Sequence, residues 1–234
     1  MREILISSPA KKNATSTATL EALARDLQAA GGEPVLLSGA GDVFSAGLDL
    51  EEVATLDVPR ARKLLAALEG TVEALFTYPA PTVALVNGHA IAGGCVLALC
   101  CDHRVAAVNP RARIGLNEVA AGLAFPPKTL AMIRARLSPS QAEQAILGAR
   151  LVDPAAAREA GLVDEVAEDA RAVALARLEA LSRHPREAYA RAKRALRTGA
   201  MRLSDAQQRS LEEEIVPLWG SEETRAAARR LLAR

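Results

Sequence analysis

Short apolar runs, several of them rich in β-branched residues, alternate with helical patterns over the first two-thirds of the chain. Each run is bounded by polar or turn residues, so we expect strands at 4–6, 34–37, 82–86 and 103–107. Between them, apolar residues recur at helical spacing over 20–27, 59–76 and 93–101. Strands that alternate with helices predict an α/β fold with a parallel sheet.

The last third of the chain has a different pattern, in which helices follow one another directly. Ser138-Pro139-Ser140-Gln141 has the form of a capping box and predicts a helix start. We expect helices at 140–147, 154–160, 170–182, 185–197, 204–218 and 222–232. This change divides the chain into a βα core, residues 1–137, and a helical C-terminal region, residues 138–234.

Composition excludes several classes of protein. Hydrophobic residues make up 50% of the 234 residues, too many for a disordered chain. The formal charge of +1 provides no basic field for nucleic acid or an anionic membrane, so we expect neither partner. The longest apolar run, 90–101, is too short to span a bilayer, and the N-terminus lacks a signal-peptide pattern. We therefore expect a cytoplasmic protein.

The sequence predicts no metal site and no nicotinamide cofactor. Cys95, Cys100 and Cys101 form an odd, clustered set without ligand spacing, which is typical of buried thiols. A possible dinucleotide loop begins at Gly39, but Phe44 occupies the position of its third glycine. A bulky ring there would prevent close packing of helix on strand.

Three segments combine small residues, glycines and one carboxylate. They are FSAGLDL at 44–50, NGHAIAGGC at 87–95 and IGLNE at 114–118. Glycine-rich turns at helix starts leave backbone N–H groups free to bind an oxygen that gains negative charge. A buried carboxyl has a raised pKa, which suits proton transfer near neutral pH. These parts suit the removal of a proton next to a carbonyl.

The same segments resemble the signatures of the enoyl-CoA hydratase/isomerase family, also called the crotonase family. Residues 44–50 resemble its first signature and residues 81–104 its second, while 12–14 and 147–166 match in character and spacing. Residues 114–118 are similar to the mitochondrial Δ3,Δ2-enoyl-CoA isomerase branch. The resemblance covers almost the whole chain. It implies a crotonase-like spiral of ββα units with a helical C-terminal subdomain that takes part in trimerisation and closes the pocket.

The resemblance also implies the substrate and its contacts. The substrate is an acyl-CoA thioester, no cofactor is needed beyond the coenzyme A that it carries, and the assembly is a homotrimer or hexamer. The N–H groups of Leu48 and Gly93 form the oxyanion hole, and residues 123–127 shape the pocket floor. The residues in the substrate-binding region are Ser45, Ala46, Leu48, Asp49, Leu50, Gly93 and Gly94.

The catalytic carboxylates of the family set the expected reaction. Its hydratases use two glutamates, whose positions are 96 and 118 here; the chain has Val96 and Glu118. A single carboxylate fits a double-bond shift, in which Glu118 moves a proton from C2 to C4 of a 3-enoyl-CoA. Two alternatives stay open: a hydratase or thioester hydrolase that recruits another acid or an ordered water, and a weakly catalytic acyl-CoA-binding protein.

Several other polar residues have simpler structural explanations. Asp49 stands at an expected helix start and suits capping. Asp102 and Arg104 flank a strand, where an ion pair or hydrogen-bond anchor is expected. The basic residues between Arg183 and Arg197 are expected to form a solvated helix face. Trp219 is expected in packing or in a subunit interface.

Overall fold

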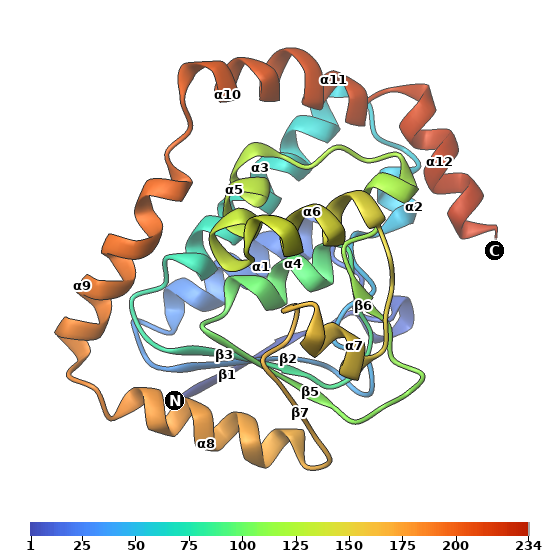
Figure 1. The fold of residues 1–234 in the computed structure, drawn as a ribbon. Helices are drawn as coiled ribbons and strands as arrows, with labels where there is room; N and C mark the ends of the chain where they lie inside the picture. Colours follow the sequence, from blue (N-terminus) through green and yellow to red (C-terminus); the bar gives the residue numbers. More distant parts are fainter. Residues whose placement is uncertain (234) are drawn as a thin grey trace.

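A five-stranded parallel sheet lies at the centre of the molecule, and the computed structural model describes it with the rest of residues 1–233 (Figure 1). Neighbouring strands run parallel throughout. In spatial order the strands are β1 (Arg2–Ile6), β2 (Val35–Gly39), β3 (Thr82–Val86), β5 (His103–Ala107) and β7 (Glu165–Ala167). The four predicted strands are confirmed, and β7 is an additional edge strand.

Burial explains which strands the sequence predicts. Every residue of β2 and β3 is buried, because helices cover both faces of the sheet. Parallel strands covered on both faces have continuous apolar sequences. By contrast, β7 is half-buried along its length and starts with a glutamate, so it lacks an apolar run.

Twelve α-helices and four helical turns of other types accompany the sheet within residues 1–233. In chain order the helices are α1 (Thr17–Ala29), α2 (Leu50–Val53), α3 (Val58–Phe76), α4 (Gly93–Cys100), α5 (Pro127–Arg136), α6 (Pro139–Gly148), α7 (Pro154–Glu159), α8 (Ala170–Ser182), α9 (Arg186–Arg197), α10 (Asp205–Ser210), α11 (Val216–Trp219) and α12 (Glu222–Leu232). Single turns of other helical types are η1 (Pro9–Lys11), η2 (Val119–Ala121), η3 (Thr198–Met201) and η4 (Leu211–Ile215).

Helices form layers on the two sides of the sheet. On one side α8 packs against β2, β3 and β5 around a small core that includes Leu36, Val83 and Leu178. On the other side α1 and α4 lie next to the sheet, and α3 and α5 lie beyond them (Figure 1).

Most predicted helices are confirmed within a few residues, and two regions differ. The capping box at Ser138 is present and starts α6. The sequence analysis does not predict α5, although Pro126 precedes this helix and Pro127 is its first residue, a position that suits proline. The helix predicted over 204–218 is interrupted by η4, a π-helical turn between α10 and α11.

A second, two-stranded sheet brings distant loops together. Its strands β4 (Ala90–Ile91) and β6 (Ile114–Gly115) pair in parallel. An isolated bridge joins Ser45 to Ala90, and another joins Ile114 to Val152. The three segments that the sequence singled out, 44–50, 87–95 and 114–118, therefore lie side by side.

The expected solvated face of α9 is wrong for two of its basic residues. Lys193 and Arg197 are buried and contact Asp102, at 2.8 Å from Nζ to Oδ1 and 2.7 Å from Nη1 to Oδ1. Arg104 pairs with Asp164. The structural roles expected for Asp102 and Arg104 are therefore confirmed. The other basic residues of the stretch, Arg183, Arg186, Arg191 and Arg194, are exposed.

Within residues 1–233, no helix combines the length and the apolar character needed to cross a membrane.

Candidate active site

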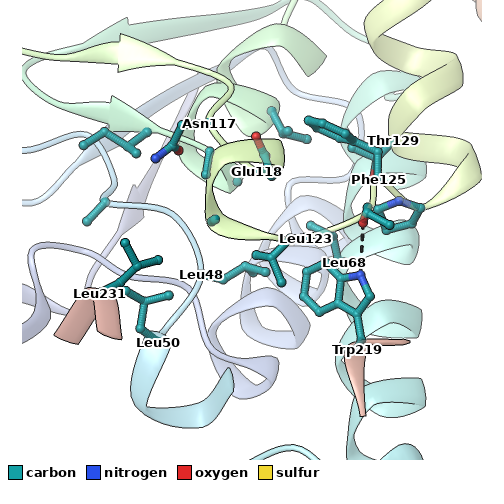
Figure 2. A pocket seen from close by; sticks show the side chains of 18 residues that line it. Leu48, Leu50, Leu68, Asn117, Glu118, Leu123, Phe125, Thr129, Trp219 and Leu231 are labelled. Carbon is teal, nitrogen blue, oxygen red and sulfur yellow. Dashed lines mark hydrogen bonds between the residues drawn. The ribbon is translucent and has the colours of Figure 1, made fainter. Parts of the chain in front are cut away.

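An apolar cavity of about 210 Å³ lies where the small sheet meets the helical layers (Figure 2). Its wall is built mainly from the segments 46–50, 91–96 and 117–129. Leu68 of α3, Trp219 of α11 and Leu231 of α12 complete it. The predicted residues Leu48, Gly93 and Glu118 all lie on this wall, as do Ala46 and Leu50.

Hydrogen bonds on both sides fix the loop that presents the Leu48 amide. Thr15 N donates to the Gly47 carbonyl (2.7 Å) and Asp49 N donates to the Thr15 carbonyl (3.0 Å), so the Leu48 N–H points away from this pairing. Gly47 has a φ of +92°, and a Cβ on it would lie 2.7 Å from the Ile91 carbonyl oxygen. Only glycine fits this position without strain.

The Gly93 amide is the first of helix α4, where no intrahelical partner exists. Ala92 precedes it with φ +49° and ψ −120°, a conformation that is strained for a residue with a Cβ. The Ala92 amide donates to the Gly115 carbonyl (2.8 Å), which ties this turn to β6. The turn therefore holds the helix N-terminus against the cavity.

The two amides are close neighbours and both are free. A Cβ on Gly93 would lie 3.6 Å from Leu48 N, and a Cβ on Gly47 would lie 3.5 Å from Gly93 N. Within residues 1–233, neither amide donates to a backbone carbonyl. Two free N–H groups beside one cavity can bind an oxygen that becomes negative during a reaction.

Glu118 is buried in the cavity wall with little to stabilise its charge. Burial raises the pKa of its carboxyl to about 8, although its own backbone N–H acts to lower it. Its Oε2 atom is buried and has no hydrogen-bond partner among the described residues. Its backbone carbonyl accepts from the amides of Ala121 and Leu123, so the main chain at this position is fixed. Such a carboxyl can exchange a proton with a ligand near neutral pH.

Val96 occupies the cavity wall on α4, one turn after Gly93. Its aliphatic side chain is buried and supplies no proton-transfer group. Among the described residues that line the cavity, Glu118 is the only one with a titratable side chain.

Three residues predicted for the substrate region have other positions. The Ser45 hydroxyl is buried and donates to the Asn13 carbonyl (2.8 Å), and a Cβ on Gly94 would lie 2.5 Å from the Ser45 carbonyl oxygen. These two residues pack the loop against α4. Asp49 accepts from Glu51 N, which starts α2, and from Lys11 Nζ at 2.7 Å. The expected capping role of Asp49 is confirmed.

The structure also adds cavity residues that sequence reasoning missed. Asn117 and Thr129 each place a polar side chain on the wall, and their Oδ1 and Oγ1 atoms are buried without a hydrogen-bond partner among the described residues. Asn117 directly precedes Glu118, so the IGLNE segment held a signal for it. Thr129 lies in the helix that was not predicted.

Trp219 closes one side of the cavity within the same chain. It is fully buried, and its Nε1–H donates to the Ala124 carbonyl (3.0 Å; Figure 2). The expected packing role is confirmed. This bond links α11 to the loop 123–126, which lies beside Glu118 on the wall.

Comparisons with known proteins identify the family of this chain. The family model described as enoyl-CoA hydratase/isomerase matches residues 1–228. A putative enoyl-CoA hydratase of Thermus thermophilus is 35% identical over 178 residues, which cover 73% of this chain and 69% of that protein. The mouse mitochondrial enoyl-CoA delta isomerase 1 is 37% identical over 150 residues, which cover 64% of this chain and about half, 51%, of the relative.

The fold comparison gives the same result. The human mitochondrial delta3-delta2-enoyl-CoA isomerase superposes with a TM-score of 0.88 and 27% sequence identity, over 95% of this chain and 89% of that one. The predicted crotonase-like α/β fold is therefore confirmed. The chain belongs to the enoyl-CoA hydratase/isomerase family.

Proposed function

We propose that this protein shifts the double bond of a 3-enoyl-CoA to give a 2-enoyl-CoA. One observation carries the proposal: the only titratable side chain on the described cavity wall, Glu118, faces the same cavity as the free amides of Leu48 and Gly93. A single acid–base group beside an oxyanion hole is the equipment that this isomerisation needs. Coenzyme A enters as part of the substrate, and the reaction requires no other cofactor.

Glu118 and the two amides are sufficient for the reaction, because the proton that leaves C2 is the one that returns to C4. The ionised Glu118 carboxylate removes a proton from C2, and the electron pair moves into a dienolate whose negative charge lies on the thioester oxygen. The amides of Leu48 and Gly93 donate to that oxygen; each such donor typically contributes about 3 kcal/mol to the transition state. The carboxylic acid of Glu118 then returns the proton to C4, and the conjugated thioester forms.

Hydration is the competing reaction, because a relative named as a putative enoyl-CoA hydratase matches a larger share of the chain than the mouse isomerase does. Adding water to a double bond needs a group that activates the water and a group that delivers a proton. Val96 leaves one wall of the cavity without either group. For this reason we favour the isomerase.

The test compares the purified protein with a Glu118→Gln variant on 3-enoyl-CoA and 2-enoyl-CoA. We expect isomerised product from the first substrate, and a loss in kcat of at least about 100-fold in the variant because general acid–base catalysis is removed. For the unmodified protein, kcat/KM should rise with pH up to about 8, since the ionised carboxylate is the base.

A Glu69→Gln variant is the matched control. Glu69 is also buried with its pKa raised by burial, but it holds Lys128 N and does not line the cavity. It should keep most of the activity. Near-normal turnover by Glu118→Gln would refute the proposal. Formation of 3-hydroxyacyl-CoA or free coenzyme A would favour the hydratase or hydrolase, and tight binding without product the acyl-CoA-binding protein.

We further infer, from the family resemblance, that the chain assembles as a homotrimer or hexamer and works in the cytoplasm. Light scattering of the purified protein measures its mass and separates the two assemblies.

A further inference from the structure

Thr129 carries a hydroxyl that the protein itself does not satisfy. The residue is 1% exposed, it lies on the cavity wall, and its Oγ1 atom has no hydrogen-bond partner within residues 1–233. Figure 2 shows it on α5 close to Phe125, one of the apolar residues at this part of the wall.

A second buried threonine shows what a structural hydroxyl does in this protein. Thr71 is also completely buried, and its Oγ1 lies 2.8 Å from the Ala67 carbonyl oxygen and 3.0 Å from that of Leu20. It therefore joins α3 to α1. Thr129 makes no such link, and leaving a buried hydroxyl unpaired costs stability.

The start of α5 does not explain the hydroxyl either. The free amides of this first turn face Glu69, which accepts from Lys128 N at 2.6 Å. The side chain of Thr129 takes no part in this cap. Valine would fill the same space without an unsatisfied polar atom, so the hydroxyl has no evident structural use.

We propose that Thr129 determines substrate specificity, and that the acyl chain bound here carries a neutral hydrogen-bonding oxygen, a hydroxyl or keto group, on the part that lies against α5. This proposal rests on the proposed function in one respect, since it takes the occupant of the cavity to be an acyl thioester. A threonine hydroxyl can both donate and accept, so it suits either oxygen.

The charged groups on the cavity wall make an acidic acyl tail unfavourable. Among the described residues of the wall there is no Lys, Arg or His, while Glu118 is present. A carboxylate tail would be buried without a counter-ion and close to a second acid, which is strongly unfavourable. An unsubstituted hydrocarbon tail would bury further apolar area, but it would leave the Thr129 hydroxyl unpaired.

The experiment measures binding by calorimetry with saturated acyl-CoA probes, which the proposed reaction cannot consume. The probes are octanoyl-CoA and its three derivatives with a hydroxyl on one of the last three carbons. At least one hydroxylated derivative should bind the unmodified protein about tenfold more tightly than octanoyl-CoA. In Thr129→Val this preference should fall at least about tenfold, because a ligand hydroxyl then stays unpaired. Thr129→Ser should retain it.

Folding is checked separately by urea unfolding. Thr129→Val should be at least as stable as the unmodified protein, whereas Thr71→Val, the matched control, should be less stable because its hydroxyl has partners.

Equal binding of all four probes by the unmodified protein would overturn the specificity proposal and leave the proposed function intact. A preference for a hydroxylated probe that Thr129→Val keeps unchanged would overturn it too. Absence of binding for every probe would instead contradict the proposed function on which the inference rests.

Discussion

Two residues of this cavity, Glu118 and Ala92, are held in arrangements that cost local stability. Glu118 has little to balance its charge when it ionises, and Ala92 adopts a backbone conformation that suits glycine better. Strained backbone and unsatisfied polar groups tend to occur at functional sites, where the surrounding structure enforces them. Here the strand β6 of the small sheet fixes this conformation, because the Ala92 amide donates a hydrogen bond to the Gly115 carbonyl.

Replacing Val96 with glutamate should change the reaction. The side chain at 96 lies on the cavity wall that contains Glu118, so Val96→Glu supplies a second acid–base group. We expect hydration of 2-enoyl-CoA to rise about 100-fold over a Val96→Gln variant, because general acid–base catalysis typically contributes on the order of 10²- to 10⁴-fold. The measurement follows loss of the conjugated thioester absorbance.

Val96→Gln controls for size and polarity, since it has the same length as glutamate and cannot take up or release the proton. Equal and negligible hydration by both variants would show that position 96 does not determine the choice between isomerisation and hydration.

The residues that could be predicted from the sequence are those with a local signature. Leu48, Gly93 and Glu118 lie in segments that resemble the family's signatures, and all three prove to line one cavity. Ser45 and Gly94 share these segments but pack the loop against α4 instead. Spacing along the chain does not distinguish a residue that faces the cavity from one that supports it, because both are required by the same turn.

At the scale of elements, a buried charged cluster attaches α9 to the sheet. Asp102 precedes β5, and its carboxylate contacts Lys193, Arg197 and the Tyr189 hydroxyl. Burial by itself would raise the pKa of Asp102, but Lys193 and then Arg197 hold it below its ordinary value. Burial lowers the pKa of Lys193 to about 8 despite its bond to Asp102. The cluster therefore depends on all its members being present.

Removing the acid of this cluster should destabilise the protein severely. Asp102→Asn leaves Lys193 and Arg197 buried without a counter-charge, which typically costs about 3–5 kcal/mol. Urea unfolding measures the loss. The control is Glu187→Gln in α9, the helix that carries Lys193 and Arg197. This change breaks an exposed ion pair with Arg191 and should change stability by less than about 1 kcal/mol. Similar stabilities for the two variants would contradict a structural role for the cluster.

Element prediction succeeds where a continuous apolar run or clear end signals mark the element. The strand β3 is buried throughout, and α12 has Ser221 as its N-cap, acids in its first turn and arginines in its last, so both have the predicted bounds. The helix α5 has no side-chain N-cap and no acid in its first turn, and its apolar positions are mixed with lysine and arginine, so the sequence does not reveal it. The sequence predicts that Lys193 and Arg197 face solvent, because long basic side chains usually are exposed. Their contact with Asp102, which is distant in the sequence, makes them exceptions.

At the scale of the whole molecule, the cavity is assembled from parts that the sequence treats separately. The division at residue 137 stays a prediction, yet residues from both sides of it share the cavity wall. Trp219 and Leu231 of the C-terminal helices face the same space as Leu48 and Glu118 (Figure 2). No local pattern could predict this, because the path of the chain over the top of the molecule brings α11 and α12 back to the site (Figure 1).

This enclosure links global stability to the proton on Glu118. Its pKa is about 8 in the folded protein and about 4.3 in an unfolded chain. Between these values the folded state holds a proton that the unfolded state has released, so the free energy of unfolding falls as pH rises. The stability that the raised pKa of Glu118 contributes is fully present below about pH 4 and is lost as pH rises through about 8. At about 1.4 kcal/mol per pKa unit, the loss is on the order of 5 kcal/mol.

Glu118→Gln removes this titration while it keeps the shape of the side chain. As pH rises from 5 to 9, the unmodified protein should therefore lose a few kcal/mol of stability relative to the variant. Taking the difference cancels the other titrating groups, such as Asp102, which both proteins share. Urea unfolding at each pH measures it. A difference that stays constant over this range would mean that Glu118 is already ionised in the folded protein, and the apolar enclosure that gives it a raised pKa would not exist in solution.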